Sequence, residues 1–437
     1  MKEEQKEIQE KQPERAGLVG LSCGSLPDFD HSDSDTMAEL EQLLETAGGQ
    51  CIFTAMQNRP TPDPRTFIGE GKAREIAELV RQNQVDLLVF DNEISPSQTR
   101  ALEEIMQCRV IDRNALILDI FADRAKTSEG KLQVELAQYQ YLLPRLSGMW
   151  SHLVRQTAGG GRSPIGTRGP GETQLETDRR HIRQRIARLQ RELENVRQIR
   201  ATQRRKRRKR EVPLVALVGY TNAGKSTLLN ALTGAGVHAN DRLFDTLDPT
   251  TKSYRMEDGT EILISDTVGF IRKLPHHLVD AFKATLEELT YADVLVHVID
   301  ASSDIWDSQA QVVERLIEEL GAQQTPRIVV FNKCDKMPLD FQPRMTGAVH
   351  ISAKTGEGLE ALLAAIRQTL GRDKIRVEFV LPYARASVLD MLYRDADVKK
   401  AEYQEEGIAV EVVCDQQVLG RLYEFVPQYR PKEEWED

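Results

Sequence analysis

The sequence lacks the features of a membrane-spanning, disulfide-rich or zinc-binding protein. It contains no run of about 18 apolar residues, the length that a helix needs to cross a bilayer. Its five cysteines are scattered without a C-x-x-C pair, which argues against a disulfide framework and a zinc site. Residues 1–16 are charged throughout and lack an apolar segment, so they predict a disordered leader and not a signal peptide. We expect a cytoplasmic protein and leave loose membrane association open.

Charge is abundant but unevenly distributed. The 437 residues, 40% hydrophobic and 29% charged, are typical of a globular chain of about three domains. The net charge is −10, yet residues 179–210 hold 15 Lys and Arg against two acidic residues, a local charge of +13. This asymmetry predicts contact with a polyanion through one segment. No aromatic residue interrupts the basic run 204–210, which favours phosphate contact over base stacking.

The first part of the chain alternates apolar runs with amphipathic stretches of helical length. This alternation predicts a small parallel α/β subdomain over residues 17–127, with strands at 18–23, 51–55, 86–90 and 109–112. Ser95 before Pro96 fits a helix N-cap. The segment "FIGEGKAREI", residues 67–76, is more typical of a tight turn than of a phosphate site, although a second nucleotide site, for ATP, stays open.

Two long helical patterns follow over residues 128–211 and predict a helical hairpin. Pro144 should kink the first helix. The connection 156–172 is rich in glycine and basic, so we expect a mobile tip that suits a narrow, negatively charged cavity; a flexible turn is the alternative. RNA contacts are predicted for Arg162, Arg168, Arg179, Arg180 and Arg183. The two apolar stripes consist of Leu132, Leu136, Tyr139, Leu143, Leu146, Trp150 and Leu153, and of Leu175, Ile182, Ile186, Leu189, Leu193, Val196 and Ile199.

A phosphate-binding loop opens a nucleotide domain over residues 212–372. An apolar strand runs into G-x-x-x-x-G-K-S at residues 219–226, and a helix begins there. The glycines let backbone N–H groups approach the β-phosphate, Lys225 places its ammonium between the β- and γ-phosphates, and the Ser226 hydroxyl ligates Mg²⁺. Asn222 either helps to hold K⁺, as in GTPases that use a monovalent cation, or stabilises the loop.

Three companion motifs follow in order. Asp266 ends an apolar strand and can hold Mg²⁺ through water, and the Gly269 N–H can contact the γ-phosphate. In "VVFNKCD" (329–335), the Asp335 carboxylate can accept the N1–H and N2–H of guanine, which adenine does not offer. GTP is therefore favoured over ATP. Residues 352–354, Ser-Ala-Lys, support the base.

The two switch regions are less regular. The segment 238–252 is polar and suits a switch loop that orders around the γ-phosphate and Mg²⁺, with Thr246, Thr250 and Thr251 as candidate hydroxyl ligands. Phe270 stands where many GTPases place the glutamine that orients the attacking water. Hydrolysis must therefore depend on the phosphate loop and Mg²⁺, with K⁺ as an open further candidate, and we expect it to be slow until a partner stimulates it.

These motifs together resemble the HflX family of ribosome-associated GTPases over roughly residues 18–370. The resemblance rests on "RGPGETQLETDRRHIRQRI", "GYTNAGKSTLLNAL", "FDTLDPTTK", "DTVGFIRKLPHHLVDAFKATLEE" and "NKCD". It implies an N-terminal α/β subdomain, a hairpin and a GTPase domain that bind the large (50S) ribosomal subunit and its rRNA. It also implies that the tip lies near the peptidyl-transferase region, and that stalled ribosomes are split or rescued under stress. The tip of this chain is longer than the family pattern.

The motifs and the resemblance together assign the site. The resemblance implies Thr246 as the Mg²⁺ ligand of the first switch, and the catalytic set is Lys225, Thr246, Gly269 and Asn222. Nucleotide contacts are predicted for Gly219, Tyr220, Thr221, Asn222, Ala223, Gly224, Lys225, Ser226, Phe244, Asp245, Thr246, Leu247, Asp248, Asp266, Thr267, Val268, Gly269, Asn332, Lys333, Cys334, Asp335, Ser352, Ala353 and Lys354.

Residues 373–437 predict a small C-terminal α/β domain of strand, helix and strand. We expect a monomer without DNA specificity. The alternative functions are a nucleotide-dependent RNA-binding or ribosome-assembly factor and a tRNA-modification GTPase, although no second catalytic site for such a modification is evident.

Overall fold

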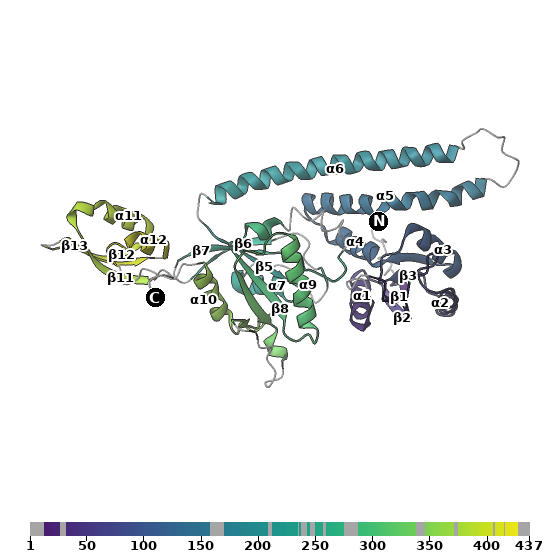
Figure 1. Ribbon diagram of the computed structural model, residues 1–437, viewed down its shortest axis with the longest axis horizontal. Coiled ribbons are helices and arrows are strands. Elements are labelled where there is room, and N and C mark those ends of the chain that lie inside the picture. The colour runs from purple at the N-terminus through teal and green to yellow at the C-terminus, as the bar shows by residue number, and fades with distance from the viewer. Residues whose placement is uncertain are drawn as a thin grey trace, which may run out of the picture.

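The computed structural model describes residues 13–26, 32–157, 170–208, 212–234, 236, 243–244, 250–256, 259–274, 287–337, 345, 347–370, 375–404, 407–414 and 416–426. The chain forms three sheets and a long helical hairpin (Figure 1). The domain with the second sheet lies between the other two, and the hairpin runs along one side of the molecule. The fold is mixed α/β with parallel sheets, as the sequence predicts.

The first sheet is parallel throughout, in the order β2-β1-β3-β4. The structure confirms the four predicted strands: β1 (Arg15–Cys23), β2 (Gln50–Arg59), β3 (Leu87–Phe90) and β4 (Arg109–Asp112). Parallel neighbours require crossover connections, and helices provide them. Ser95 caps the third helix in a capping box with Gln98, as expected. The helices are α1 (Ser34–Thr46), α2 (Glu70–Asn83), α3 (Pro96–Met106) and, after the last strand, α4 (Arg113–Arg124).

The hairpin consists of α5 (Ser128–Thr157) and α6 (Pro170–Arg208). The two helices pack through Leu136, Leu189 and Leu193, which belong to the predicted stripes. The stripe on α6 does not stay buried to its end, since Ile199 is 59% exposed. α5 continues through Pro144 and does not end there. The tip between the helices, including Arg162 and Arg168, lies outside the described residues.

The second sheet has the order β10-β9-β8-β5-β7-β6, and only the edge strand β6 is antiparallel. β5 is fully buried near the centre, so the loop at its carboxyl end is held on a rigid support. The strands are β5 (Leu214–Gly219), β6 (Thr250–Arg255), β7 (Glu261–Asp266), β8 (Val294–Asp300), β9 (Arg327–Asn332) and β10 (Val349–His350). The helices include α7 (Lys225–Thr233), α9 (Trp306–Glu319), α10 (Leu359–Thr369), η2 (Glu287–Tyr291) and η3 (Cys334–Lys336).

The third sheet is antiparallel, in the order β11-β13-β12, with its own core. The predicted strand, helix and strand correspond to β11, α11 and β13. The sequence analysis misses α12 and the edge strand β12, whose residues are largely exposed and so lack an apolar alternation. The domain comprises β11 (Ile375–Leu381), η4 (Tyr383–Arg385), α11 (Ser387–Asp395), β12 (Asp397–Gln404), β13 (Gly407–Cys414) and α12 (Gln416–Leu422).

A continuous core joins the first two domains. Phe121 of α4 meets Phe244 of the central domain edge to face, with ring centroids 4.7 Å apart. Both rings belong to one buried cluster that also contains Phe270. The domain that carries the phosphate loop is therefore packed directly against the N-terminal subdomain. None of the helices in the described ranges has the length and apolar character to cross a membrane.

Candidate nucleotide site

The phosphate loop, residues 219–226, joins β5 to α7 and needs both of its glycines. Gly224 has φ +93°, in the left-handed region, and a Cβ there would lie 2.2 Å from Asn332 Nδ2. A Cβ on Gly219 would lie 2.2 Å from the Val298 carbonyl oxygen on β8. No side chain fits either place without moving the backbone or its neighbour. The loop therefore lies closer to adjacent strands than any residue but glycine allows.

Lys225 is folded back over this loop. Its Nζ donates to the carbonyl oxygens of Gly219, at 3.0 Å, and Tyr220, at 2.8 Å. The side chain is buried, and burial lowers the pKa of Lys225 to about 8, against a weaker opposing effect of Asp266. The ammonium is thus held within the loop, ready to interact with phosphate.

A hydroxyl and a carboxylate meet beside the loop. Ser226 Oγ donates to Asp266 Oδ2 at 2.6 Å. Two such oxygens suit Mg²⁺, which prefers hard oxygen ligands, and Mg²⁺ bound here would neutralise charge on the β- and γ-phosphate oxygens. Of the other candidate hydroxyls, Thr251 donates to Ser265 Oγ at 3.0 Å, and Thr250 pairs with Asp266 across β6 and β7. Within the ranges that the structure describes, no group of three or more His, Cys, Asp or Glu side chains could hold a metal.

The second switch, residues 266–273, runs along the phosphate loop. The Phe270 N–H donates to Gly219 O at 3.2 Å, and the Thr221 N–H donates to Phe270 O at 2.7 Å. The Phe270 side chain is 1% exposed and points into the core. A Cβ on Gly269 would lie 2.9 Å from Thr221 Cα, so the switch backbone touches the loop at this glycine. Phe270 therefore holds the switch to the phosphate loop through its backbone hydrogen bonds and to the core through its ring.

The base-recognition motifs converge at the same edge of the sheet. Asn332 Nδ2 donates to Ala223 O, and Asn332 Oδ1 accepts from the Ala353 N–H, both at 2.9 Å. Ser352 Oγ donates to Asp335 Oδ1 at 2.7 Å, which orients that carboxylate. One buried amide thus connects the phosphate loop with both segments predicted to hold the base.

The remaining predicted residues occupy varied positions. Lys333 has φ +64° and pairs with Asp300 at 2.7 Å. Thr267 Oγ1 donates to Leu217 O at 2.6 Å, and Cys334 Sγ donates to Phe331 O at 3.3 Å. Val268 is buried, whereas Asn222 and Lys354 are exposed. Asp245, Thr246, Leu247 and Asp248 lie outside the described residues, and Arg179, Arg180 and Arg183 lie on α6 in the hairpin.

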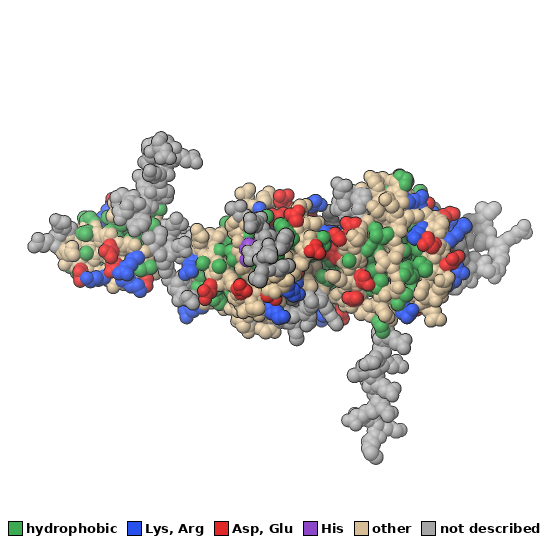
Figure 2. All heavy atoms as spheres, turned by 90° about the horizontal axis from the view of Figure 1, so that it is seen from below, with side chains coloured by type: hydrophobic (Ala, Val, Ile, Leu, Met, Phe, Trp, Pro, Cys, Tyr) green, Lys and Arg blue, Asp and Glu red, His purple; other side chains and the backbone are tan. Residues whose placement is uncertain are grey.

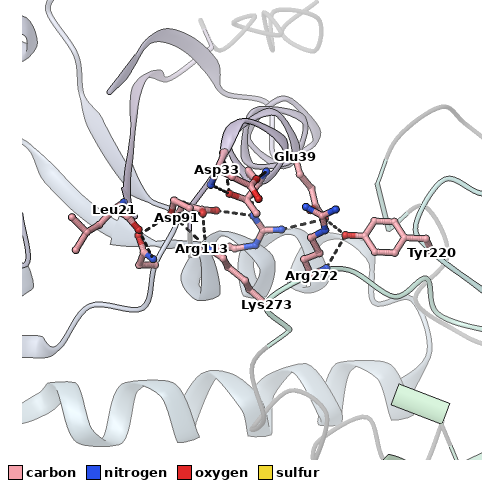
Figure 3. Close-up of polar contacts among 11 residues, drawn as sticks. Leu21, Asp33, Glu39, Asp91, Arg113, Tyr220, Arg272 and Lys273 are labelled. Atoms are coloured by element: carbon pink, nitrogen blue, oxygen red, sulfur yellow. Dashed lines mark hydrogen bonds and ion pairs between the residues drawn. The ribbon is translucent and has the colours of Figure 1, made fainter. Parts of the chain in front are cut away.

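Two predicted contact residues direct their side chains toward the N-terminal subdomain. Tyr220 donates its hydroxyl to Glu39 Oε1 on α1 at 2.7 Å (Figure 3). Phe244 packs on Phe121, as described above. The sequence motif places both residues at the nucleotide by position and gives no sign of these partners, because Glu39 is 181 residues away in the chain.

The phosphate loop at the carboxyl end of a central parallel strand, with Asp266 and Asn332 at the ends of neighbouring strands, is the arrangement of a P-loop GTPase. Family models agree along the chain: "GTP-binding GTPase N-terminal" matches residues 34–122, "GTP-binding GTPase Middle Region" 124–207, "50S ribosome-binding GTPase" 214–333 and "HflX C-terminal domain" 343–418.

Full-length relatives define the family. The chain is 45% identical over 416 residues to the "GTPase HflX" of Caldanaerobacter subterraneus subsp. tengcongensis, covering 94% of each chain. It is also 45% identical over 382 residues to the "GTPase HflX" of Escherichia coli, covering 86% of this chain and 88% of that one. The chain belongs to the HflX family, and its activity is GTP hydrolysis. A solved GTP-binding protein of Sulfolobus solfataricus in complex with GDP is 24% identical over 82% of this chain and 98% of its own, with a TM-score of 0.42, a likeness too distant to support a functional argument.

Proposed function

We propose that this GTPase binds the large ribosomal subunit in the cytoplasm in its GTP state, with the hairpin tip near the peptidyl-transferase region, and that GTP hydrolysis permits release. The cycle would split or rescue stalled ribosomes under stress. The hairpin is the observation that carries the proposal, because it combines length, basic charge and a firm attachment to the body. The description of the family model over residues 214–333 as a 50S ribosome-binding GTPase supports the same partner.

The hairpin is long and exposes basic side chains. At 1.5 Å per residue, the 39-residue α6 is about 58 Å long. Some of its arginines are already paired, such as Arg185 with Glu135 at 2.6 Å. Arg180 and Arg183 are exposed, and neither forms an ion pair within the part of the chain that the structure describes. Such side chains are available for phosphate groups of RNA.

The base of the hairpin is held firmly on the N-terminal subdomain. Asp112, at the end of β4, accepts hydrogen bonds from Tyr141 Oη at 2.8 Å and from Arg145 Nη2 at 2.9 Å. The Arg145 guanidinium also lies over the Tyr141 ring, 3.6 Å from its centroid. Burial raises the pKa of Asp112, and Arg145 opposes this effect. These contacts join the first helix of the hairpin to the sheet of the subdomain.

The opposite side of the molecule has a different character. Figure 2 views the chain from the side away from the hairpin and shows acidic and basic side chains interspersed on that face. Residues 179–210, by contrast, carry a local charge of +13 in a chain whose net charge is −10. Electrostatic attraction to rRNA would therefore orient the molecule with its hairpin toward the ribosome.

For the chemistry, we propose that the residues act as the motifs predict. The phosphate loop and Lys225 hold the phosphates, Ser226 and Thr246 hold Mg²⁺, and the Gly269 N–H contacts the γ-phosphate. Asn222 is exposed on the loop with φ +61°, a position that suits a contact with K⁺ bound beside the phosphates. Since Phe270 is buried and cannot orient water, intrinsic turnover should be slow and the ribosome should raise it.

The hairpin contact can be tested by charge reversal. The double variant Arg180→Glu/Arg183→Glu should bind large subunits more weakly and reduce the slope of log affinity against log salt by about 2. The matched control is Arg74→Glu/Arg315→Glu, which reverses two exposed arginines on α2 and α9. Binding is measured by co-sedimentation with a nonhydrolysable GTP analogue. Indistinguishable binding by the test and control variants would contradict the hairpin assignment.

The nucleotide dependence distinguishes the alternative function. A ribosome-gated GTPase binds large subunits more tightly with the GTP analogue than with GDP, because ribosome and γ-phosphate stabilise the same state. Equal binding with both nucleotides would instead favour an RNA-binding or assembly factor that uses the hairpin irrespective of nucleotide. Splitting is measured separately, by the GTP-dependent conversion of whole ribosomes to subunits in a sucrose gradient.

A further inference from the structure

One hydroxyl joins three distant segments next to the phosphate loop. Tyr220, the second residue of that loop, donates to Glu39 Oε1 on α1 at 2.7 Å. The Tyr220 hydroxyl oxygen also accepts a hydrogen bond from the backbone N–H of Arg272, in the second switch, at 2.8 Å (Figure 3). The tyrosine is 6% exposed, so water does not compete freely for these bonds. The loop, the switch and the N-terminal subdomain therefore meet at a single atom.

A buried chain of ion pairs leads from this atom back to the switch. Arg113 of α4 contacts Glu39 Oε1 at 3.2 Å and Asp91 Oδ1 at 2.9 Å. Asp91 Oδ2 in turn pairs with Lys273, the residue after Arg272. Burial alone would raise the pKa of Asp91, but Arg113 and Lys273 lower it, so the carboxylate stays charged. At Glu39, by contrast, burial outweighs the opposing effects of Arg113 and the Tyr220 hydrogen bond and raises the pKa of the carboxyl.

The backbone at Lys273 is an independent sign that the switch is held in place. Lys273 has φ +54°, in the left-handed region that lysine rarely adopts. Such a conformation persists only when its surroundings over-determine it. Here the side chain is 6% exposed and its Nζ reaches Asp91 in the N-terminal subdomain. The contact with Asp91 therefore holds the end of the switch in a backbone conformation that lysine rarely adopts.

These contacts bear on the Gly269 N–H, the group that the motif places at the γ-phosphate. Phe270, two residues before Arg272, is bonded to Gly219 and Thr221 in the phosphate loop. Gly269 lies directly against Thr221, so the position of its N–H depends on where residues 270–272 are held. The Tyr220 hydroxyl adds a further hydrogen bond between loop and switch, which it accepts from the Arg272 N–H. Glu39 orients that hydroxyl from outside the GTPase domain.

We propose that Tyr220 is a positioning residue for GTP hydrolysis, through which the N-terminal subdomain holds the second switch against the phosphate loop. By bonding the Arg272 N–H, the Tyr220 hydroxyl positions the Gly269 N–H. Glu39 orients that hydroxyl, and the Asp91–Lys273 ion pair holds the end of the switch next to it. This inference requires the GTPase activity of the family and is independent of the ribosomal partner. By linkage, contact of the γ-phosphate with Gly269 strengthens the association of the two domains.

The test uses the full-length Tyr220→Phe variant, which removes one oxygen. The single-turnover rate of GTP hydrolysis should fall by about tenfold, the effect of one lost hydrogen bond of about 1.4 kcal/mol in the transition state. GDP affinity should change by less than about twofold, because GDP lacks the γ-phosphate that Gly269 contacts. Tyr383→Phe is the matched control, since it removes a hydroxyl that donates to Gln404 O at 2.6 Å in the C-terminal domain. Unchanged or faster hydrolysis in Tyr220→Phe, or an equal loss of GDP affinity, would overturn the proposal.

Substitutions in the N-terminal subdomain keep the proposal testable if the loop variant folds poorly. Glu39→Gln retains an acceptor for the tyrosine hydroxyl and should lose less turnover than Glu39→Leu, which has none. In a double-mutant cycle, Tyr220→Phe should have a smaller effect in the Glu39→Leu background than in the wild type. Fully additive effects, or equal turnover of the two Glu39 variants, would show that Glu39 does not act through Tyr220.

Discussion

Replacing Asn332 with alanine should both destabilise the GTPase domain and weaken guanine nucleotide binding. The amide is 2% exposed and bonds Ala223 O and the Ala353 N–H at 2.9 Å each. Alanine leaves both backbone groups buried without a partner, at about 1–3 kcal/mol each, so the free energy of unfolding should fall by about 2–6 kcal/mol. For a domain of this size the loss corresponds to a midpoint lowered by at least about 4 °C.

The assay follows the thermal transition that GDP stabilises, because this chain has several domains and need not unfold in one step. GDP affinity should fall by about tenfold or more, because the Asn332 hydrogen bonds that connect the phosphate loop with the base-binding segment are lost. Asn332→Asp keeps an acceptor for the Ala353 N–H but places a second oxygen against Ala223 O, which it cannot bond. This variant should therefore also be less stable than the wild type. The control is Asn195→Ala, an exposed position on α6. A midpoint within about 1 °C of wild type with unchanged GDP affinity would refute the role of Asn332.

Three further predictions concern buried groups of the GTPase domain. Phe270→Gln should not accelerate GTP hydrolysis and should lower the unfolding midpoint, because it places an amide in the apolar site of a ring that is 1% exposed; faster turnover would show that the glutamine reaches the attacking water. Bound phosphate should raise the pKa of Lys225 from about 8, so GDP affinity should fall by about tenfold between pH 7 and pH 9, and a flat titration profile would contradict this. Burial lowers the pKa of His297 to about 4, so the unfolded state binds the proton at a higher pH than the folded state does. The free energy of unfolding should therefore decrease by about 3 kcal/mol as the pH falls from 6.5 to 4. Urea titrations should show this pH dependence for the wild type and not for His297→Gln.

Much of the phosphate site could be predicted from sequence because its parts are local or lie at strand ends. The loop is one contiguous motif, although the motif does not specify the close contacts with Val298 and Asn332 that require Gly219 and Gly224. Asp266 and Asn332 end parallel strands of one sheet, and parallel strands bring their carboxyl ends to the same edge. The order of the motifs along the chain was therefore enough to place these residues together.

The connection to the N-terminal subdomain could not be predicted in this way. Tyr220 and Glu39 are 181 residues apart, and Lys273 and Asp91 are 182 apart. No periodicity or motif relates such positions, because they meet only through the tertiary packing of two domains. Its position in the phosphate loop predicts that Tyr220 contacts the nucleotide. Only the tertiary structure shows that its hydroxyl bonds Glu39 in another domain. β12 was missed for a different reason, since an exposed charged edge strand has no apolar pattern.

The ribosome-gated GTPase is tested most directly by measuring GTP turnover of the full-length protein in K⁺ buffer, alone and with purified large or small ribosomal subunits. We expect slow turnover alone, strong stimulation by large subunits and none by small subunits. Stimulation should be weaker for Arg180→Glu/Arg183→Glu than for the Arg74→Glu/Arg315→Glu control. Turnover that is the same with all additions would contradict a ribosome-gated GTPase.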